Sequence, residues 1–321
     1  MVDAPMKTPA TAAGMRDETV VIMAMVAVLA ALPALGVYPY FVMQALCFAL
    51  FACAFNLLIG FVGLLSFGHA MFLGTAGYAS AHAAKVWGLP PELCILFGAL
   101  CAGVMGYFVG LIAIRRQGIY FSMTTLALAQ MIYFFYLQAK FTHGEDGIQG
   151  VPQALFLGFL DLSKPLVLFY VVLAIFLAGF LLIYRTVNSP FGEILKAIRE
   201  NEPRAISLGY RTARYKLAAF VLSASLAGLA GATKVIVSQN ASLTDVRWEM
   251  SGEVVLMTLV GGLGTIFGPV VGAFVIIAMQ QYLAEFGQWV LVIQGVIFVT
   301  CVLAFRRGIV GEIAHVLRRN L

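Results

Sequence analysis

Long stretches without charge dominate this sequence. Between Glu18 and Lys85 there is no Asp, Glu, Lys or Arg, and further stretches of this kind follow along the chain of 321 residues. A helix crosses a bilayer with about 20 predominantly apolar residues, so a chain of this length has room for roughly eight to ten crossings. Only 11% of the residues are charged, against about 25% in soluble domains. The sequence therefore excludes an ordinary soluble enzyme, a disordered chain and a nucleic-acid-binding module.

Ten apolar segments are candidate membrane spans. They cover residues 20–37, 39–62, 66–87, 91–114, 118–140, 164–185, 214–237, 249–261, 269–283 and 287–305. The segments 249–261 and 269–283 are too short to cross singly at about 1.5 Å per residue, and a glycine-rich stretch from Gly261 to Pro269 separates them. We therefore predict an all-α, polytopic transmembrane helix bundle of roughly eight to ten spans with broken or re-entrant helices.

Basic residues gather in the gaps between these segments. Counted over ten crossings, every cluster falls on the same side of the membrane, which the positive-inside rule identifies as the cytoplasm. The clusters are Lys7 and Arg16, Arg115 and Arg116, the group from Arg185 to Lys216, and Arg306, Arg307, Arg318 and Arg319. Residues 1–19 and 306–321 are thus predicted as cytoplasmic ends and 20–305 as the transmembrane domain. Within it, 186–213 is predicted as a cytoplasmic segment and 141–163 as a loop on the opposite, periplasmic face.

The five cysteines lie inside apolar segments, and none has the spacing of a metal site. We interpret them as small buried hydrophobic residues, and no metal site is predicted. They are Cys47, Cys53, Cys94, Cys101 and Cys301.

Small residues recur on one face of two candidate spans. They are Gly103, Gly106 and Gly110 in the span 91–114, and Ala224, Ala227, Gly228 and Gly231 in the span 214–237. Membrane helices associate through close packing, which small side chains permit. The sequence therefore predicts a tightly packed bundle.

The segment 186–213 is the longest polar stretch inside the transmembrane domain. Ser189 and Pro190 are typical of a helix start, and Gly209 is typical of a helix end. Between them an apolar stripe of Phe191, Leu195 and Ile198 predicts a short amphipathic helix. Two interpretations are open: an interfacial helix lying on anionic lipid, or a docking element that seats in a groove of a cytosolic partner.

The stretch Ser189–Gly209 resembles the coupling segment of the branched-chain amino acid ABC transporter permeases of the LivM type. Further resemblances lie in Asn56–His69, Gly118–Gln130, Tyr215–Phe220 and Gly261–Pro269, in the same order and spacing. Similarity to the LivM-type rather than the sister LivH-type subunit rests on Arg116–Tyr120 and Thr142–Gly147.

The sequence departs from the family pattern at two places. His143 stands where the family has a glycine. The general importer coupling motif has Glu-Ala-Ala followed by a glycine, and here Pro203 and Arg204 separate Glu202 from Ala205. Glu202 and Gly209 consequently stand one residue further apart than in the general motif.

The resemblance implies one half of a heterodimeric channel. The other half would be a LivH-type permease, two cytoplasmic ABC ATPase subunits would sit below, and a periplasmic binding protein would deliver the substrate in a bacterial inner membrane. The chain has no phosphate-binding loop of the form Gly-x-x-x-x-Gly-Lys-[Ser/Thr], so a non-catalytic subunit without a cofactor is expected. For docking to the ATPase, the resemblance implies apolar burial of Phe191, Leu195 and Ile198. Charge pairing at the rim is expected from Glu193, Arg199 and Glu202, and the coupling set is completed by Gly192, Ala205 and Gly209.

Polar groups inside the spans are candidates for a translocation pathway, because in lipid they face a cavity, a partner or the bundle interior. The alternative for each hydroxyl is a hydrogen bond to its own helix backbone, and Glu253 has the alternative of a place at the periplasmic rim. The candidates are Asn56, Ser66, His69, Tyr120, Thr124, Thr125 and Glu253.

The function expected from the resemblance is ATP-driven import of branched-chain or other hydrophobic amino acids. The same architecture for urea or short amides is the alternative within that class. An ion-coupled secondary transporter would carry several charged residues in mid-span, and here Glu253 and Lys234 are the only plausible ones. An intramembrane hydrolase using Ser66 and His69 would need an orienting group and an oxyanion site, and neither is visible in the sequence.

Overall fold

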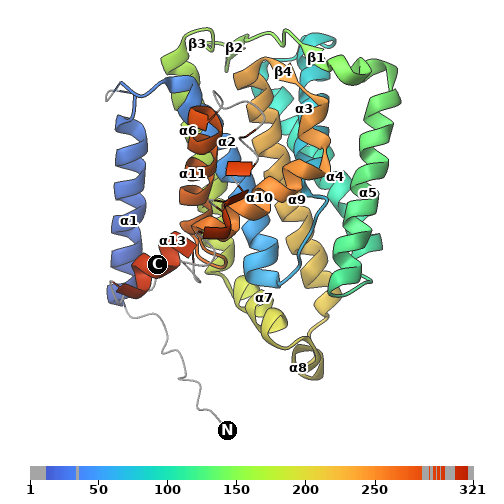
Figure 1. The fold of residues 1–321 in the computed structure, drawn as a ribbon, viewed down its shortest axis with the longest axis vertical. Helices are drawn as coiled ribbons and strands as arrows, with labels where there is room; N and C mark the ends of the chain where they lie inside the picture. Colours follow the sequence, from blue (N-terminus) through green and yellow to red (C-terminus); the bar gives the residue numbers. More distant parts are fainter. Residues whose placement is uncertain are drawn as a thin grey trace.

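The computed structural model describes residues 12–33, 36–283 and 308–316, with short pieces between 289 and 300. Most of the helices run along the long axis of a bundle (Figure 1). The longer helices are α1 (Ala12–Ala31), α2 (Pro39–Asn56), α3 (His69–Lys85), α4 (Pro91–Ala113), α5 (Ile119–Gln138), α6 (Pro165–Val187), α9 (Thr212–Ser238), α10 (Trp248–Gly261) and α11 (Gly268–Leu283). The prediction of an all-α bundle is confirmed, and five helices in the described part are long and apolar enough to cross a membrane. The predicted span 287–305 lies mostly outside the described residues.

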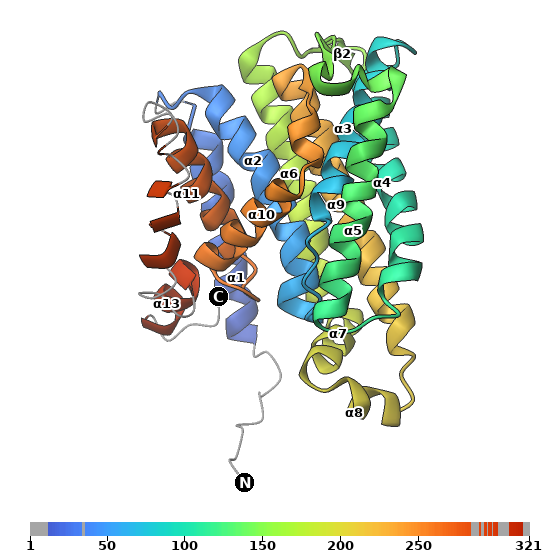
Figure 2. The ribbon, with the colours of Figure 1, turned by 45° about the vertical axis from the view of Figure 1, so that its right-hand side comes forward.

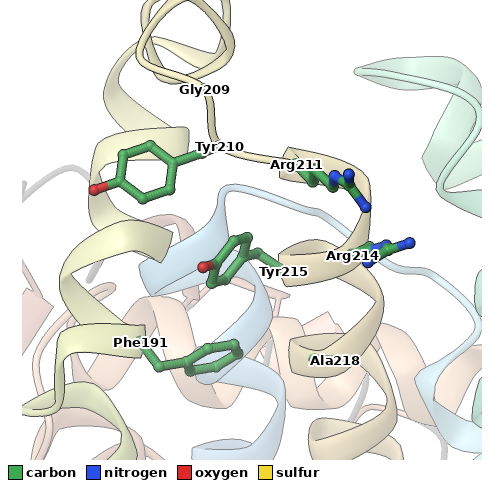
Figure 3. A pocket seen from close by; sticks show the side chains of 7 residues that line it. All are labelled: Phe191, Gly209, Tyr210, Arg211, Arg214, Tyr215 and Ala218. Carbon is green, nitrogen blue, oxygen red and sulfur yellow. The ribbon is translucent and has the colours of Figure 1, made fainter.

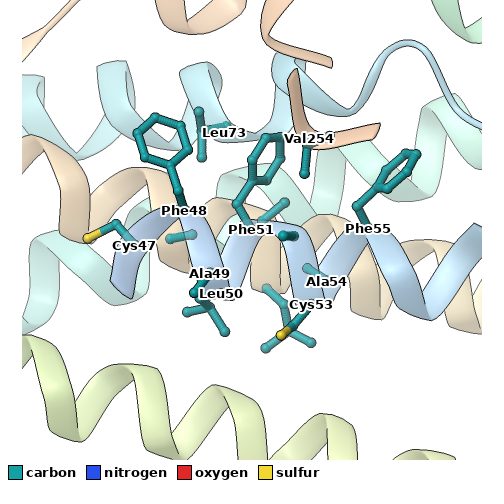
Figure 4. Close-up of a cluster of buried hydrophobic side chains, with 14 of the residues drawn as sticks. Cys47, Phe48, Ala49, Leu50, Phe51, Cys53, Ala54, Phe55, Leu73 and Val254 are labelled. Carbon is teal, nitrogen blue, oxygen red and sulfur yellow. The ribbon is translucent and has the colours of Figure 1, made fainter. Parts of the chain in front are cut away.

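Helix α2 runs through the core of the bundle. Its sequence is apolar on every side, and a helix of that kind is stable only when neighbours surround it. Phe48, Phe51 and Phe55 point toward Leu73 of α3 and Val254 of α10, while Leu50 and Cys53 lie on the opposite side (Figure 4). Cys47, Cys53 and Cys94 are buried, as the sequence predicts.

Helices α3, α4 and α9 pack closely because glycines lie where they meet. A Cβ at Gly98 of α4 would lie 2.7 Å from the carbonyl oxygen of Ala76 and 2.9 Å from Cβ of Ala232. A Cβ at Gly77 of α3 would lie 3.0 Å from Cγ2 of Val235. The close packing predicted from small residues is therefore confirmed.

Two breaks interrupt the helices near the middle of the bundle. Helices α10 and α11 have 14 and 16 residues, and Gly262 and Gly264 take positive φ values of 127° and 74° between them. The first break in chain order follows α2, which continues as a π-helix, η1 (Leu57–Val62), and then loses helical structure until α3 begins at His69. This non-helical segment, residues 63–68, appears as the thin blue strand of chain beside α5 (Figure 2). The predicted broken pair at 249–283 is confirmed.

The two ends of the bundle carry different structures. One end holds α7 (Pro190–Glu200) and α8 (Glu202–Ser207). The other holds short 3₁₀ turns and strands (Figure 1): η2 (Lys140–Thr142), η3 (Gly144–Asp146), β1 (Ile148–Gln149), β2 (Leu155–Phe156), β3 (Leu160–Asp161), β4 (Asn240–Ala241) and η4 (Leu243–Val246). Strand β1 pairs antiparallel with β4, and β2 with β3. The last described element, α13 (Gly308–Val316), packs against α10 and α11.

The loop 142–147 contains the departure from the family pattern. His143 has a φ of 58° and so occupies the left-handed region where glycine is usual. Gly147 has a φ of 66°, and a Cβ there would overlap the carbonyl oxygen of Ala241. The loop therefore keeps the backbone conformation of a glycine at residue 143 although the side chain is a histidine.

Candidate functional site: the coupling helices and the glycine junction

The helical pair α7–α8 begins and ends as its sequence predicts. The hydroxyl of Ser189 accepts a hydrogen bond from the backbone N–H of Gly192 at 3.4 Å, and Pro190 occupies the first turn. Asn201 then caps α8 by accepting from the N–H of Arg204 at 3.0 Å. Gly209 follows α8 with a φ of 90°.

The apolar stripe of α7 faces the chain's own bundle. Leu195 is 0% exposed and Ile198 is 3% exposed, because α7 packs against η1, α6 and α9. Phe191 is half-buried, with its ring centroid 5.9 Å from that of Tyr215. Leu195 and Ile198 therefore do not form the docking surface that was expected of them. An amphipathic helix buries its apolar face on the nearest apolar surface, and here the end of α2 provides that surface.

The outer surface of the pair is formed by other residues. Glu193 is exposed, and its carboxylate lies 2.7 Å from Nζ of Lys196. Ile206 and Leu208 are 55% and 70% exposed. These two aliphatic side chains could not be predicted from the sequence as part of this surface, because α8 has only six residues and is too short to show a helical period.

The carboxylate of Glu202 is turned toward the bundle. It lies 2.6 Å from Nζ of Lys216 on α9 and accepts a hydrogen bond at 3.2 Å from Nε2 of Gln117, in the turn between α4 and α5. Instead of forming a charged rim, Glu202 ties α8 to two other parts of the chain. The predicted rim role of this residue does not fit that placement.

Arg199 joins α7 to the first break. Its guanidinium donates a hydrogen bond from Nη1 to the carbonyl oxygen of Gly60, in the π-helix η1. A Cβ at Gly63 would lie 3.2 Å from Cγ of Arg199, and one at Gly264 would lie 3.3 Å from Nη1. One side chain of α7 thus contacts both glycine-rich segments.

Asn56 joins the first break to the second. Its side chain is 2% exposed. Nδ2 donates to the carbonyl oxygen of Thr265 at 2.8 Å, and Oδ1 accepts from the N–H of Gly264 at 3.1 Å. A Cβ at Gly60 would lie 2.9 Å from that same Gly264 nitrogen, so only a glycine permits the approach. We call the set Asn56, Gly60, Arg199, Gly264 and Thr265 the glycine junction.

The non-helical segment 63–68 is held by its neighbours. Oγ of Ser122 on α5 donates to the carbonyl oxygen of Leu65 at 2.7 Å. Directly after the segment, in the first turn of α3, the N–H of Ala70 donates to Oγ of Ser251 on α10 at 2.9 Å. Non-helical backbone at membrane depth is tolerated only where protein or a water-filled cavity satisfies it, and here hydroxyl groups of two helices contribute.

The other pathway candidates have separate partners on different helices. Thr124 and Thr125 donate to carbonyl oxygens of their own helix, Tyr120 at 2.7 Å and Ser122 at 2.9 Å. Tyr120 is 69% exposed on the outside of α5. Glu253 is half-buried and accepts from Nε2 of Gln280 at 3.0 Å.

His69 and Ser66, the pair required by a hydrolase, have other partners. Nε2 of His69 lies 3.0 Å from Oγ of Ser223, and the ring is fully buried among aromatic side chains. Oγ of Ser66 accepts from the N–H of Gly68 at 3.4 Å. Neither arrangement pairs the two residues as nucleophile and base.

A buried ion pair lies near the end opposite α7 and α8. Nζ of Lys234 on α9 pairs with the carboxylate of Asp245 on η4 and lies 5.4 Å from the centroid of the Phe48 ring. Lys234 is recognisable in the sequence as a charged residue in mid-span, but its partner is not, because Asp245 belongs to a separate element. Within the described residues no group of three or more His, Cys, Asp or Glu could hold a metal ion.

Membrane-crossing helices, two central helix breaks and a polar helical pair at one end define this chain as a multi-pass membrane protein of the transporter class. The family model for the permease component of branched-chain amino acid transport systems matches residues 37–302, and the chain belongs to this family.

Among the proteins similar to this chain are permeases named for the transport systems to which they belong. The high-affinity branched-chain amino acid transport system permease protein LivM of Escherichia coli is 25% identical over 264 residues, which are 75% of this chain and 62% of that protein. The autoinducer 2 import system permease protein LsrC of Klebsiella pneumoniae is 28% identical over 195 residues, 59% of this chain and 54% of LsrC. A probable LivM of Methanocaldococcus jannaschii is 24% identical over 197 residues, 59% of this chain and 56% of that protein. The aligned region thus spans about three fifths of LivM, and no solved structure matches the chain. The resemblance to the LivM family is confirmed.

Proposed function

We propose that this chain is the membrane-spanning, non-catalytic permease subunit of an ABC importer for branched-chain or other hydrophobic amino acids. Its partners are a LivH-type permease, two cytoplasmic ABC ATPase subunits and a periplasmic binding protein. Both termini and the α7–α8 pair lie on the cytoplasmic side of the inner membrane. Membership of the permease family and the similarity to LivM support this proposal.

The observation that carries the proposal is the contact of Arg199 with Gly60 and Gly264. ATP hydrolysis outside the membrane drives transport only if a cytoplasmic element is mechanically joined to the membrane-embedded part. The buried stripe of Leu195 and Ile198 makes α7 part of the bundle, and Arg199 links it to both breaks. Movement of α7 on ATPase closure therefore displaces η1 and the turn between α10 and α11 together.

The docking surface of this proposal is the outer side of the pair. Glu193, Ile206 and Leu208 project from it, while Gly192 and Ala205 lie on the inner side. A Cβ at Gly192 would overlap the carbonyl oxygen of Val187, so this residue sets how closely α7 follows α6. Ala205 is buried, and Gly209 lets the chain turn from α8 to α9.

The substrate path of this proposal runs beside the helix breaks. Leu65 and Phe67 of the non-helical segment are half-buried, as is Glu253. An apolar path with few polar groups suits cargo that a separate binding protein selects.

The test is ATPase activity of the reconstituted five-subunit complex with leucine, phenylalanine, glutamate or urea in the binding protein. Stimulation by leucine and phenylalanine is expected. Stimulation by urea alone would assign the complex to amide transport. Uptake that persists with a Walker-motif variant of the ATPase would instead identify an ion-coupled transporter.

A further inference from the structure

A cavity of about 400 Å³ opens between the start of α7 and the start of α9. Its lining includes Phe191, Tyr210, Arg211, Arg214, Tyr215 and Ala218 (Figure 3). Gly209 completes the lining. Apart from Phe191 and Gly209, none of the lining residues is needed for the coupling role described above.

The cavity lies at the level where two membrane-crossing helices end. Helix α6 ends at Val187, shortly before Phe191, and α9 begins at Thr212, between Tyr210 and Tyr215. Both helices are long and apolar enough to span a membrane. The cavity is therefore at the boundary between the hydrocarbon and the aqueous phase, on the arginine-rich side.

One part of the lining is aromatic. The ring centroids of Phe191 and Tyr215 are 5.9 Å apart, and those of Tyr210 and Tyr215 are 6.1 Å apart. The three rings follow one another along the cavity (Figure 3). Tyrosine rings at this level present an apolar body and a polar tip, which suits the headgroup region of a bilayer.

The other part of the lining is cationic. The side chains of Arg211 and Arg214 lie next to each other, directed away from the three rings (Figure 3), and both are exposed. Among the described residues neither guanidinium has a hydrogen-bond or ion-pair partner. The nearby carboxylate of Glu202 is already engaged by Lys216 and Gln117.

More positive charge surrounds the rim. A Cβ at Gly110 of α4 would lie 2.7 Å from Cδ1 of Leu217, so the end of α4 lies beside the first turns of α9. Arg115 and Arg116 follow directly after α4. From Pro203 to Thr244 the sequence has no acidic residue. The segment that carries Arg211 and Arg214 therefore supplies no carboxylate to neutralise them.

We propose that this cavity binds the headgroup of an anionic phospholipid, with the phosphodiester at Arg211 and Arg214 and the glycerol end of the acyl chains against the aromatic rings. Guanidinium groups bind phosphate oxygens in bidentate geometry, and basic pockets at the cytoplasmic ends of membrane helices bind anionic headgroups. A free phosphate ion would leave the aromatic lining without a partner.

The test uses the assembled transporter in nanodiscs of phosphatidylcholine with a fraction of phosphatidylglycerol, and native mass spectrometry to count retained lipids. Arg211→Gln and Arg214→Gln are each expected to lower phosphatidylglycerol retention about tenfold, as loss of a charge-assisted hydrogen bond implies. Arg185→Gln is the matched control, because Arg185 is an exposed arginine at the same boundary, in the last turn of α6, and does not line the cavity. Equal retention in all three variants and the unaltered protein would overturn the proposal.

Two further measurements separate the other occupants. Inorganic phosphate, added as a competitor, is expected to leave retained phosphatidylglycerol in place, and full displacement by it would show a phosphate site and not a lipid site. Loss of the ATPase subunits from the Arg211→Gln and Arg214→Gln complexes with lipid retention unchanged would show a protein contact and overturn the proposal. Thermal unfolding in detergent without anionic lipid is expected to be the same for all variants, which confirms that they fold.

Discussion

The guanidinium of Arg199 donates a hydrogen bond to the carbonyl oxygen of Gly60, across 139 positions of sequence. Arg199 belongs to the amphipathic helix at the end of the bundle, and Gly60 to the π-helix that closes α2. Because Gly264 lies against the same guanidinium, this contact is where a polar surface helix meets both interrupted segments.

Replacing Arg199 is expected to uncouple ATP hydrolysis from uptake. Arg199→Gln removes a charge-assisted hydrogen bond worth about 1.5–3 kcal/mol, while Leu195 and Ile198 still hold α7 in place. The complex should therefore assemble and hydrolyse ATP, but uptake per ATP should fall about tenfold. Uptake in proteoliposomes, with Arg185→Gln as control, measures this. Normal uptake by Arg199→Gln would show that the glycine junction does not couple ATP hydrolysis to transport.

Replacing Asn56 is expected to destabilise the chain. Asn56→Ala removes the donor to Thr265 and the acceptor for Gly264, and leaves buried backbone groups without partners. The expected loss is about 2 kcal/mol, read as a lower midpoint of thermal unfolding in detergent. Asn56→Asp keeps the acceptor for Gly264 but places a carboxylate oxygen against the carbonyl oxygen of Thr265 in a buried site, so it should destabilise the chain at least as much. An unchanged midpoint in Asn56→Ala would show that the hydrogen bonds of Asn56 to Gly264 and Thr265 do not stabilise the chain.

Leu195 and Leu208 should respond in opposite ways to truncation. Leu195→Ala leaves a cavity in the packed interior and should cost about 2–5 kcal/mol of stability. Leu208, 70% exposed, should change stability by less than about 0.5 kcal/mol on truncation. Leu208→Ala should instead weaken binding of the ATPase subunits, which size-exclusion chromatography or biolayer interferometry reports. Weaker ATPase binding by a stable Leu195→Ala variant would restore the apolar stripe as the docking surface.

The ion pair of Lys234 and Asp245 should show strong coupling between its members. Lys234→Met alone leaves a buried carboxylate unpaired and is expected to cost about 3–5 kcal/mol. Adding Asp245→Leu removes that carboxylate and should recover most of the loss. A double-mutant cycle on thermal unfolding measures the coupling. Additive losses would show that the two side chains do not interact.

Replacing His143 with glycine is expected to leave the stability of the chain unchanged or to raise it slightly. Its left-handed backbone costs a residue with a Cβ about 1–2 kcal/mol, which His143→Gly relieves at the expense of unfolded-state entropy. The glycine variant should therefore be as stable as the original chain or slightly more so. His143→Val, with a branched Cβ, should be less stable than either. A valine variant of unchanged stability would contradict the backbone assignment.

Much of the fold could be predicted from local patterns. The span predicted at 39–62 coincides with α2 and η1, and the start and end of α7–α8 follow from Ser189 and Gly209. Of the candidate site, the sequence identified Asn56, Arg199 and Gly264 as members of notable segments. It assigned Asn56 to a pathway and Arg199 to a partner's rim, and the structure brings both to the glycine junction.

The sequence by itself determined the class of protein, the position of most helices and the family, because apolar length, periodicity and caps are properties of neighbouring residues. Only the tertiary structure decided which way the stripe of Leu195 and Ile198 faces, which groups form hydrogen bonds with Asn56 and which carboxylate pairs with Lys234. Those contacts join residues that are distant in sequence, such as Asn56 and Thr265, 209 positions apart. A polar group inside a membrane bundle must find a partner there, but the packing of whole helices selects that partner.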